Sequence, residues 1–519
     1  MARARLKTET VRRPDLGVIR SAPFEQVDPR ALMDAQNVRA RPGRIEKVKG
    51  WDEFSATALP GAIMLVDVAR FLSGTEIMIV ADTKRAYKYN TSTGVLDDIT
   101  ASDLTTSDAW PHFAGMWKDY WIYTNALSLV KKWSGALNLT TLAGLATDAE
   151  PGGVAVQKAK VLCPAGPFLL IGNTTEDGSP YLTRVRWNKF DVLEVWKNDA
   201  SGNGQAGYMD VSEEASEIKN IVPLGNYYAV YKQKSVHLLT YVGLPFVWAR
   251  RQVVVNRGLI APKAIVSLGD FHVCAFTDNF YIFNGATLQR IGDPIRDDFF
   301  ADLNPNKKDL MFAFHLEDKA EVVFAYPSLS ATVCDKAWVY NYITNAWTPR
   351  DFPFAAGTAY LSQLTTAWQD AVGTWGAQTI AWSDRTFLAN APVPIVGSAS
   401  TKKIYQYDTT DAKAGAAIDG YLTSVFSDFG FPDRVKRLLR IKPVCEKLDV
   451  DMLVYVITGN NSRGDSTENG PYAYNPSTDE FVDVDHAARF IAVKFRSANA
   501  NEPFTVSGWF VEFELQEDR

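Results

Sequence analysis

One stretch of the sequence has the residue spacing of a calcium-binding loop. Oxygen-bearing side chains stand at loop positions 1, 3, 5 and 12, as Asp199, Ser201, Asn203 and Asp210, and Gly204 stands at position 6. Ca²⁺ takes about six to eight oxygen ligands around a sharp turn, and the last of them is usually a bidentate Glu. Here the last candidate is Asp, and no helical pattern flanks the loop. The favoured interpretation is a polar loop between strands, with a weak calcium site as the alternative.

Other patterns that carry chemistry are missing from the sequence. There is no HxH, HExxH or CxxC spacing for a transition metal, no phosphate-binding GxxxxGK[ST] or GxGxxG, and no GxSxG nucleophile turn. Three pairs of acids are adjacent in sequence, and adjacent side chains on a strand point to opposite faces. Such pairs cannot face each other across a sugar. The acids are Asp97-Asp98, Glu213-Glu214 and Asp297-Asp298. We therefore expect a non-enzymatic protein with no catalytic residues, no bound metal and no cofactor.

The cysteines and the apolar segments indicate where the chain is made. The four cysteines are far apart in sequence, which favours buried free thiols in a reducing compartment. They are Cys163, Cys274, Cys334 and Cys445. No apolar stretch approaches the roughly 20 residues of a membrane span, and the first residues lack the apolar core of a signal peptide. We expect assembly in a cytoplasm and no membrane span.

The overall charge argues against a protein held to nucleic acid by its net charge. The formal net charge is −6, with 46% hydrophobic and 22% charged residues, which is typical of soluble globular proteins. Two basic clusters stand out, near residues 3–13 and 434–442. The first is interpreted as a solvated terminus, or alternatively as a contact with an acidic partner or DNA phosphates. The second is interpreted as the solvent-facing side of a strand or a subunit contact.

Short apolar runs separated by turn residues recur through most of the chain. Runs of four to five residues rich in aromatic and β-branched side chains are typical of buried strands, and they return about every 40 to 50 residues. That period predicts an all-β chain with a β-propeller of six to eight blades over residues 61–416. A β-sandwich or another β fold without repeats is the alternative. The expected blade starts are Ile63, Trp110, Val161, Ile218, Ala264, Met311 and Thr379.

The two flanks of this repeat have a different character. Residues 1–60 carry scattered prolines, among them Pro14, Pro23, Pro29 and Pro42, and predict an extended N-terminal arm and ring-closing segment. Residues 417–519 lose the blade pattern but keep alternating strands, which predicts a small C-terminal antiparallel β-sandwich-like domain. Within it, residues 459–480 are rich in Gly, Asn, Ser and Asp and predict a mobile loop.

Several short stretches resemble the tail nozzle or tail-hub β-propeller proteins of short-tailed, podovirus-like bacteriophages, a group similar to packaged-DNA stabilisation proteins. The opening match reads NVRARPGRIEKVKGW over residues 37–51. Each match is short, but together they span most of the chain. The matching stretches are residues 16–19, 34–51, 170–174, 181–187, 223–225, 230–232, 241–246, 269–272, 339–342 and 488–497.

The resemblance implies a structural virion protein rather than an enzyme. Proteins of this group form a hexameric ring or tube below the portal and adaptor proteins, and genomic DNA passes through the lumen without sequence-specific binding. The resemblance therefore implies a homohexamer in the phage tail that retains packaged DNA until ejection. We expect acidic residues along the lumen, because a basic wall would hold phosphates. The alternative is a receptor- or glycan-binding tail propeller that contacts the host envelope; a glycan-cleaving enzyme is a third interpretation.

Overall fold

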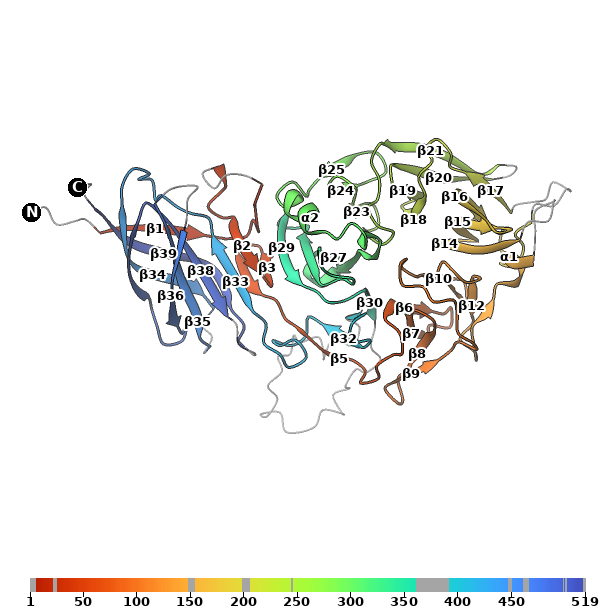
Figure 1. The fold of residues 1–519 in the computed structure, drawn as a ribbon, viewed down its shortest axis with the longest axis horizontal. Coiled ribbons are helices and arrows are strands. Elements are labelled where there is room, and N and C mark those ends of the chain that lie inside the picture. Colours follow the sequence, from red (N-terminus) through yellow and green to blue (C-terminus); the bar gives the residue numbers. More distant parts are fainter. Residues whose placement is uncertain are drawn as a thin grey trace, which may run out of the picture.

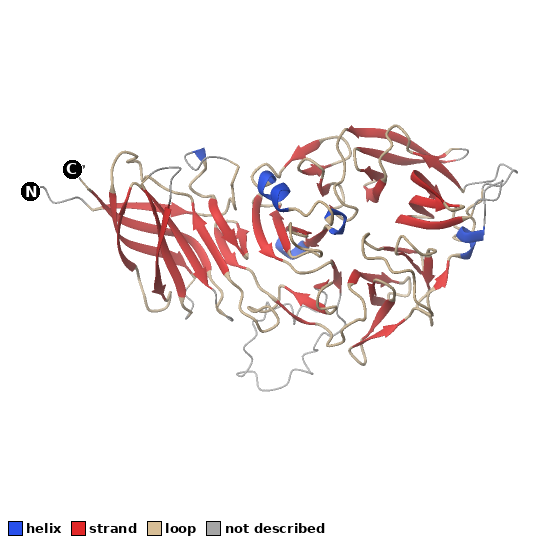
Figure 2. Ribbon diagram, viewed as in Figure 1, coloured by secondary structure: helices blue, strands red, loops and turns tan. Residues whose placement is uncertain are grey.

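The computed structural model shows an all-β protein made of two bodies, a ring of small sheets and a sandwich of two larger ones (Figures 1 and 2). No helix in the described part of the chain is both long and apolar enough to cross a lipid bilayer. The structure describes residues 6–516 except 22–25, 148–154, 198–205, 244–245, 361–391, 447–449, 461–465, 498 and 500–501.

Seven four-stranded antiparallel sheets follow one another around the ring. The first three are β6 (Ile63–Arg70), β7 (Glu76–Asp82), β8 (Ala86–Asn90) and β9 (Val95–Asp98); β10 (Phe113–Trp117), β11 (Tyr120–Thr124), β12 (Lys131–Trp133) and β13 (Thr140–Thr141); and β14 (Val156–Ala165), β15 (Phe168–Glu176), β16 (Ser179–Trp187) and β17 (Gly207–Asp210). The next two are β18 (Ile218–Leu224), β19 (Tyr227–Lys232), β20 (Ser235–Gly243) and β21 (Val247–Val255); and β22 (Ile265–Ser267), β23 (His272–Ala275), β24 (Phe280–Phe283) and β25 (Leu288–Arg290).

The sixth and seventh sheets close the ring. The sixth contains β26 (Phe312–Leu316), β27 (Glu321–Tyr326), β28 (Lys336–Asn341) and β29 (Ala346–Asp351). The seventh contains β30 (Ala356–Tyr360), β31 (Val393–Gly397), β32 (Ile404–Tyr407) and, from the N-terminal part of the chain, β5 (Trp51–Glu53). Because β5 immediately precedes the first sheet, its pairing with β32 ties the end of the ring to its beginning. The helices are α1 (Ala143–Thr147), α2 (Arg296–Asp302) and the short η2 (Lys308–Leu310) and η3 (Glu317–Lys319).

Burial explains why the middle strands are apolar on both faces. Every residue of β27, with the sequence EVVFAY, is buried, because the neighbouring sheets of the ring cover both of its faces. Six of the expected blade starts lie within five residues of the first strand of a sheet. The seventh expectation differs: Thr379 lies outside the described residues, and the first strand of that sheet begins at Ala356. The layout is that of a β-propeller.

The sandwich is built from both ends of the chain. One sheet, the β34 sheet, contains β1 (Lys7–Arg12), β3 (Val38–Arg41), β4 (Arg44–Lys47), β39 (Thr505–Leu515), β34 (Lys436–Cys445) and β37 (Val482–Ala488). The other, the β35 sheet, contains β2 (Leu32–Gln36), β33 (Gly420–Ser424), β38 (Phe490–Ser497), β35 (Met452–Gly459) and β36 (Ser466–Tyr474). The rings of Phe495 and Trp509 lie 5.4 Å apart between the two sheets, in the shared core.

Two expectations about the flanks need correction. Residues 7–53 are not a separate extended arm, because their five strands pair within the sandwich and the seventh sheet and so satisfy their backbone hydrogen bonds there. The predicted mobile loop at 459–480 contains β36, which pairs with β35 along the edge of its sheet. Most side chains of β36 face solvent, and an exposed edge strand therefore has the polar composition of a loop.

Two buried tyrosine–histidine pairs stabilise the ring. The hydroxyl of Tyr123 bonds Nδ1 of His112 at 2.8 Å, and Nε2 of His112 lies 3.2 Å from the carbonyl oxygen of Ser107. Tyr231 and His272 repeat the arrangement at 2.7 Å. Since a carbonyl only accepts, Nε2 of His112 carries the proton and Nδ1 accepts from the tyrosine. Burial lowers the pKa of His112 to about 3 and of His272 to about 4.

We expect these histidines to make the ring acid-sensitive. Their pKa values rise to about 6.5 on unfolding, so their contribution is complete above pH 6.5 and is lost as the pH falls toward 4. Each histidine should lower the free energy of unfolding by about 2 kcal/mol between pH 7 and pH 4.5. Urea titrations at the two pH values measure this loss. Carboxylates also titrate between pH 7 and 4.5, so the loss in wild type is compared with the loss in His272→Gln. The glutamine can still hydrogen-bond to Tyr231, but it does not titrate. An equal drop in wild type and H272Q would contradict the assignment.

Candidate functional site

A strap at residues 17–20 bridges the ring and the sandwich. The backbone N–H of Val18 donates to the carbonyl of Trp347 on β29, at 2.8 Å. The N–H of Leu32 on β2 donates to the carbonyl of Gly17, also at 2.8 Å. The strap therefore lies between the outer strand of the sixth sheet and the edge of the β35 sheet, and hydrogen-bonds to both.

Gly17 is the tightest point of this strap. Its φ is +71°, and a Cβ added there would lie 2.6 Å from the carbonyl oxygen of Trp347. Glycine is the residue that meets both demands, a left-handed backbone and a close backbone approach. The side chain of Trp347 is fully buried and packs within 4.9 Å of Phe280 and Tyr340, so the strap rests on a rigid support.

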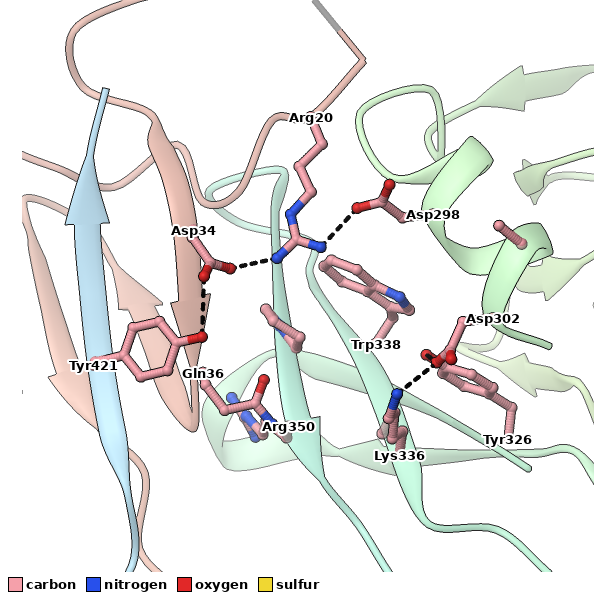
Figure 3. Close-up of a pocket in the computed structure, with 13 residues that line it drawn as sticks. Arg20, Asp34, Gln36, Asp298, Asp302, Tyr326, Lys336, Trp338, Arg350 and Tyr421 are labelled. Atoms are coloured by element: carbon pink, nitrogen blue, oxygen red, sulfur yellow. Dashed lines mark hydrogen bonds and ion pairs between the residues drawn. The ribbon is translucent and has the colours of Figure 1, made fainter. Parts of the chain in front are cut away.

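Beside the strap, Arg20 clamps the two bodies together over a pocket (Figure 3). Its guanidinium donates to Asp298 of α2 at 2.7 Å and also to Asp34 of β2. The hydroxyl of Tyr421, on β33, donates to the other oxygen of Asp34 at 3.0 Å. The pocket has a volume of about 480 Å³ and is lined by both bodies. Arg20 thus joins a carboxylate of the ring to a carboxylate of the sandwich.

The opposite wall of the pocket belongs to the ring alone. Lys336 bonds Asp302 at 2.9 Å, and the hydroxyl of Tyr326 donates to the same carboxylate at 3.0 Å. Burial raises the pKa of both Tyr326 and Tyr421, so each hydroxyl stays protonated as a donor. The pocket therefore has the chemistry of a structural ion-pair network between two domains.

The region where the strap, Arg20 and β3 connect the ring to the sandwich is called the joint here. It contains a buried cluster of four charged groups. Arg39 of β3 donates to Glu321 and to Asp408, each at 3.0 Å, and Arg350 of β29 donates to Glu321 at 2.6 Å. All four side chains are at most 3% exposed. Burial alone would raise the pKa of Glu321, but Arg350 and Arg39 lower it to about 2. The cluster joins the sandwich strand β3 to the sixth and seventh sheets.

Long side chains from different sheets contact one another across the middle of the ring. The amines of Lys160 and Lys219 lie 4.5 and 4.9 Å from the ring of Trp110, and that of Lys263 lies 5.4 Å from the ring of Phe113. Phe113 lies on β10 of the second sheet and Trp110 just before it, whereas Lys219 lies on β18 of the fourth sheet and Lys263 just before β22 of the fifth. Contacts between sheets that are not neighbours around the ring cross its centre.

Two carboxylates complete this central cluster. Glu217 bonds Lys160 at 3.2 Å and Lys219 at 2.8 Å. Asp309, on η2, bonds Lys219 at 2.9 Å. Side chains of the second, third and fourth sheets therefore meet here with side chains from the segments that lead into the fifth and sixth sheets.

An aromatic surface, defined here as Phe190, Tyr241 and Phe246, covers the third and fourth sheets. Their exposed fractions are 42%, 48% and 77%. Phe168 lies under this surface, with its ring 5.6 Å from those of both Phe190 and Tyr241. Buried Trp248 lies 5.8 Å from Tyr241. Figure 1 shows these sheets at the end of the ring away from the sandwich.

The structure describes only one of the four calcium-loop candidates. Asp199, Ser201 and Asn203 lie outside the described residues. Asp210 ends β17, where Arg184 binds both of its carboxylate oxygens at 2.8 and 2.9 Å. Within the described part of the chain, no group of three His, Cys, Asp or Glu side chains could hold a metal ion.

The basic clusters and the cysteines have structural surroundings. On β34, Arg437 and Arg440 pair with Asp485 and Asp483 on the solvent side, as expected for a solvent-facing strand. Lys436, in the same cluster, is instead buried and donates to the carbonyl of Phe431 at 2.7 Å. Lys7 belongs to β1 and lies 3.7 Å from the ring of Phe431. All four cysteines are free, and three are buried.

The sequence did not predict the residues of the joint, because their partners are remote in sequence. Arg39 lies in the NVRAR stretch that the sequence singled out, yet its partners Glu321 and Asp408 are more than 280 residues away. The strand itself reads VRAR, and its alternation of small apolar and charged residues does not distinguish a buried Arg39 from a solvent-facing one.

Comparisons with known proteins identify no family and one distant structural neighbour described here. No family model matches the chain, and no curated protein matches it. Among solved structures, the Neurospora crassa Pan2 WD40 domain is similar, with 7% sequence identity and a TM-score of 0.38. That match covers 70% of this chain and 99% of the domain. The propeller assignment here rests on the order of the strands in the seven sheets.

Proposed function

We propose that this chain is a structural virion protein that forms a ring or nozzle in the tail of a short-tailed bacteriophage. Packaged DNA is held back by this nozzle and passes through it on ejection. The observation that carries the proposal is the joint: the N-terminal strands run through both bodies, and Arg20 and Arg39 tie them together. A subunit that resists the pressure of packaged DNA needs bodies that do not move against each other.

Each four-stranded sheet is one blade of a closed seven-bladed propeller in this proposal. Trp110 and Phe113 contact three lysines across its centre, and in this proposal DNA does not run along the propeller axis. The conduit must then lie between copies of the chain, as in a hexamer. A closed ring arises when one surface of a subunit meets a different surface of the next at a fixed rotation. The net charge of −6 suits a lumen wall that does not grip phosphates.

Neighbouring tail proteins complete the assembly. The portal and adaptor proteins would sit on one side of the ring and distal tail proteins on the other, with the virion tail as the final location. The aromatic surface is the part of the propeller best suited to such a contact, because exposed aromatic side chains concentrate binding energy at interfaces.

The decisive test is the mass and shape of the purified protein. Light scattering and negative-stain imaging should show a ring or short tube of about six copies. The same measurement is repeated after adding purified adaptor protein. A monomer under both conditions, at high concentration, would contradict the proposal.

A pair of variants tests whether the aromatic surface contacts another copy of the chain or a neighbouring tail protein. Phe246→Ser should weaken the assembly, because Phe246 is 77% exposed within the aromatic surface. Leu137→Ser is the matched control, since Leu137 is 88% exposed but lies between β12 and β13 of the second sheet. Equal assembly of both variants would exclude the aromatic surface as the contact.

A receptor- or glycan-binding tail propeller is the second candidate. The same aromatic surface favours it, because aromatic faces stack on sugar rings. Binding to isolated host envelopes, lost in F246S and kept in L137S, would support this candidate over the nozzle.

A further inference from the structure

Arg350, in the buried cluster of the joint, has hydrogen-bonding capacity that its protein contacts leave unused. Its side chain is fully buried, and its Nη2 donates to Glu321 at 2.6 Å. Its Nε and Nη1 are also buried, but neither has a hydrogen-bond partner among the described residues. Arg184 shows how a buried arginine is satisfied elsewhere in this chain, because all three of its nitrogens donate to the carboxylates of Glu176 and Asp210, at 2.8 to 2.9 Å.

The carboxylates of the same cluster have unused oxygens as well. Oε1 of Glu321 accepts from Arg350 and Arg39, whereas its Oε2 accepts from no described residue. Oδ1 of Asp408 accepts from Arg39, but its Oδ2 lies 3.8 Å from the amine of Lys319, too far for a direct hydrogen bond. Both carboxylate side chains are 1% exposed. One connected set of ion pairs therefore contains two unused donors and two unused acceptors.

This mixture of donors and acceptors determines what kind of molecule can bind. Buried polar groups are nearly always hydrogen-bonded, either to protein or to ordered water, and leaving a charged group without partners is costly. An anion would accept from Arg350 but would be repelled by Glu321 and Asp408, and a cation would be repelled by the arginines. Water both donates and accepts, and a buried water typically makes about three hydrogen bonds.

We propose that the buried cluster of the joint binds ordered internal water. One molecule accepts from Arg350 and donates to Oε2 of Glu321, two side chains that already touch. A second bridges Oδ2 of Asp408 to the amine of Lys319, since a polar contact of that length is commonly mediated by water. The water completes the hydrogen bonds of the ion pairs without neutralising any of them. This inference does not depend on the proposed function.

The first test is a crystal structure or cryo-EM map of the full chain at a resolution that shows ordered water. A density peak is expected within about 3.2 Å both of Nε or Nη1 of Arg350 and of Oε2 of Glu321. The proposal would be overturned if no peak were present there and Arg350 donated directly to protein, for example to the hydroxyl of neighbouring Tyr407. A peak beside Asp408 alone would overturn it too, because Arg350 would remain unexplained.

The second test counts internal water in solution by ¹⁷O magnetic relaxation dispersion. Arg350→Met removes both unused donors and fills similar space, so the number of long-lived waters should fall by about one molecule. Arg437→Met is the control and should leave that number unchanged, because Arg437 is an exposed arginine on the sandwich. Equal numbers in R350M and wild type would contradict the site. If R350M does not fold, as judged by circular dichroism, the wild-type density map decides alone.

Discussion

Replacing Arg39 with Met should lower the free energy of unfolding by about 3–5 kcal/mol, because it leaves two buried carboxylates without their shared cation. Arg39 bonds both Glu321 and Asp408, and the carboxylates are 1% exposed. Methionine fills similar space, so the loss comes from the broken charge pairs rather than from a cavity. Glu321 keeps only Arg350, and Asp408 keeps only Lys319, whose amine lies 3.8 Å away. Urea unfolding followed by tryptophan fluorescence measures it.

The matched control is Arg437→Met. Arg437 forms a shorter ion pair with Asp485, at 2.6 Å, but the two side chains are 43% and 65% exposed. Solvent screens such a pair, so R437M should leave the urea midpoint nearly unchanged. If R39M were as stable as R437M, the buried cluster would not hold the joint.

The same variant should also shift the acid transition. The pKa of Glu321 is lowered to about 2 in the folded protein against an ordinary value of 4.5. This group therefore contributes stability that is complete above pH 4.5 and is lost as the pH falls toward 2. Without Arg39 that pKa rises, and R39M should unfold at a higher pH than wild type during acid titration.

The strand pattern could be predicted from sequence because burial is local in the chain. Runs such as Val322 to Tyr326 are covered on both faces, so their composition alone marks them as strands. The first strand of each of the first six sheets was located in this way. The predicted start of the seventh sheet was wrong, because residues 361–391 separate its first two strands, β30 and β31, and interrupt the repeat period.

Contacts between remote segments could not be predicted in the same way. The pairing of β1 with β39 joins residues about 500 positions apart, and the strap meets Trp347 across more than 320 positions. Nothing in the local pattern of residues 7–20 distinguishes a strand at the edge of a sandwich from a free extended arm. The calcium-loop spacing was local and visible, but the partner of Asp210 is Arg184 on the neighbouring strand.

Gly17→Ala should be the most damaging single-methyl change in the joint. The new Cβ would lie 2.6 Å from the carbonyl oxygen of Trp347, and the backbone would stay left-handed. Strain and overpacking together should cost about 2–5 kcal/mol. The strap would then lift from β29, and limited proteolysis should cut near residues 13–30 faster than in wild type.

Gly166→Ala separates the backbone strain from the overpacking. Gly166 has a φ of +63°, but nothing lies within 4 Å of a Cβ added there. It carries the backbone penalty alone, about 1–2 kcal/mol, and should leave proteolysis near residues 13–30 unchanged. The nozzle proposal adds a further expectation: G17A should assemble less well than G166A even where both are folded. If G17A assembles normally while its strap is cut faster, the joint stabilises the chain without being needed for the ring.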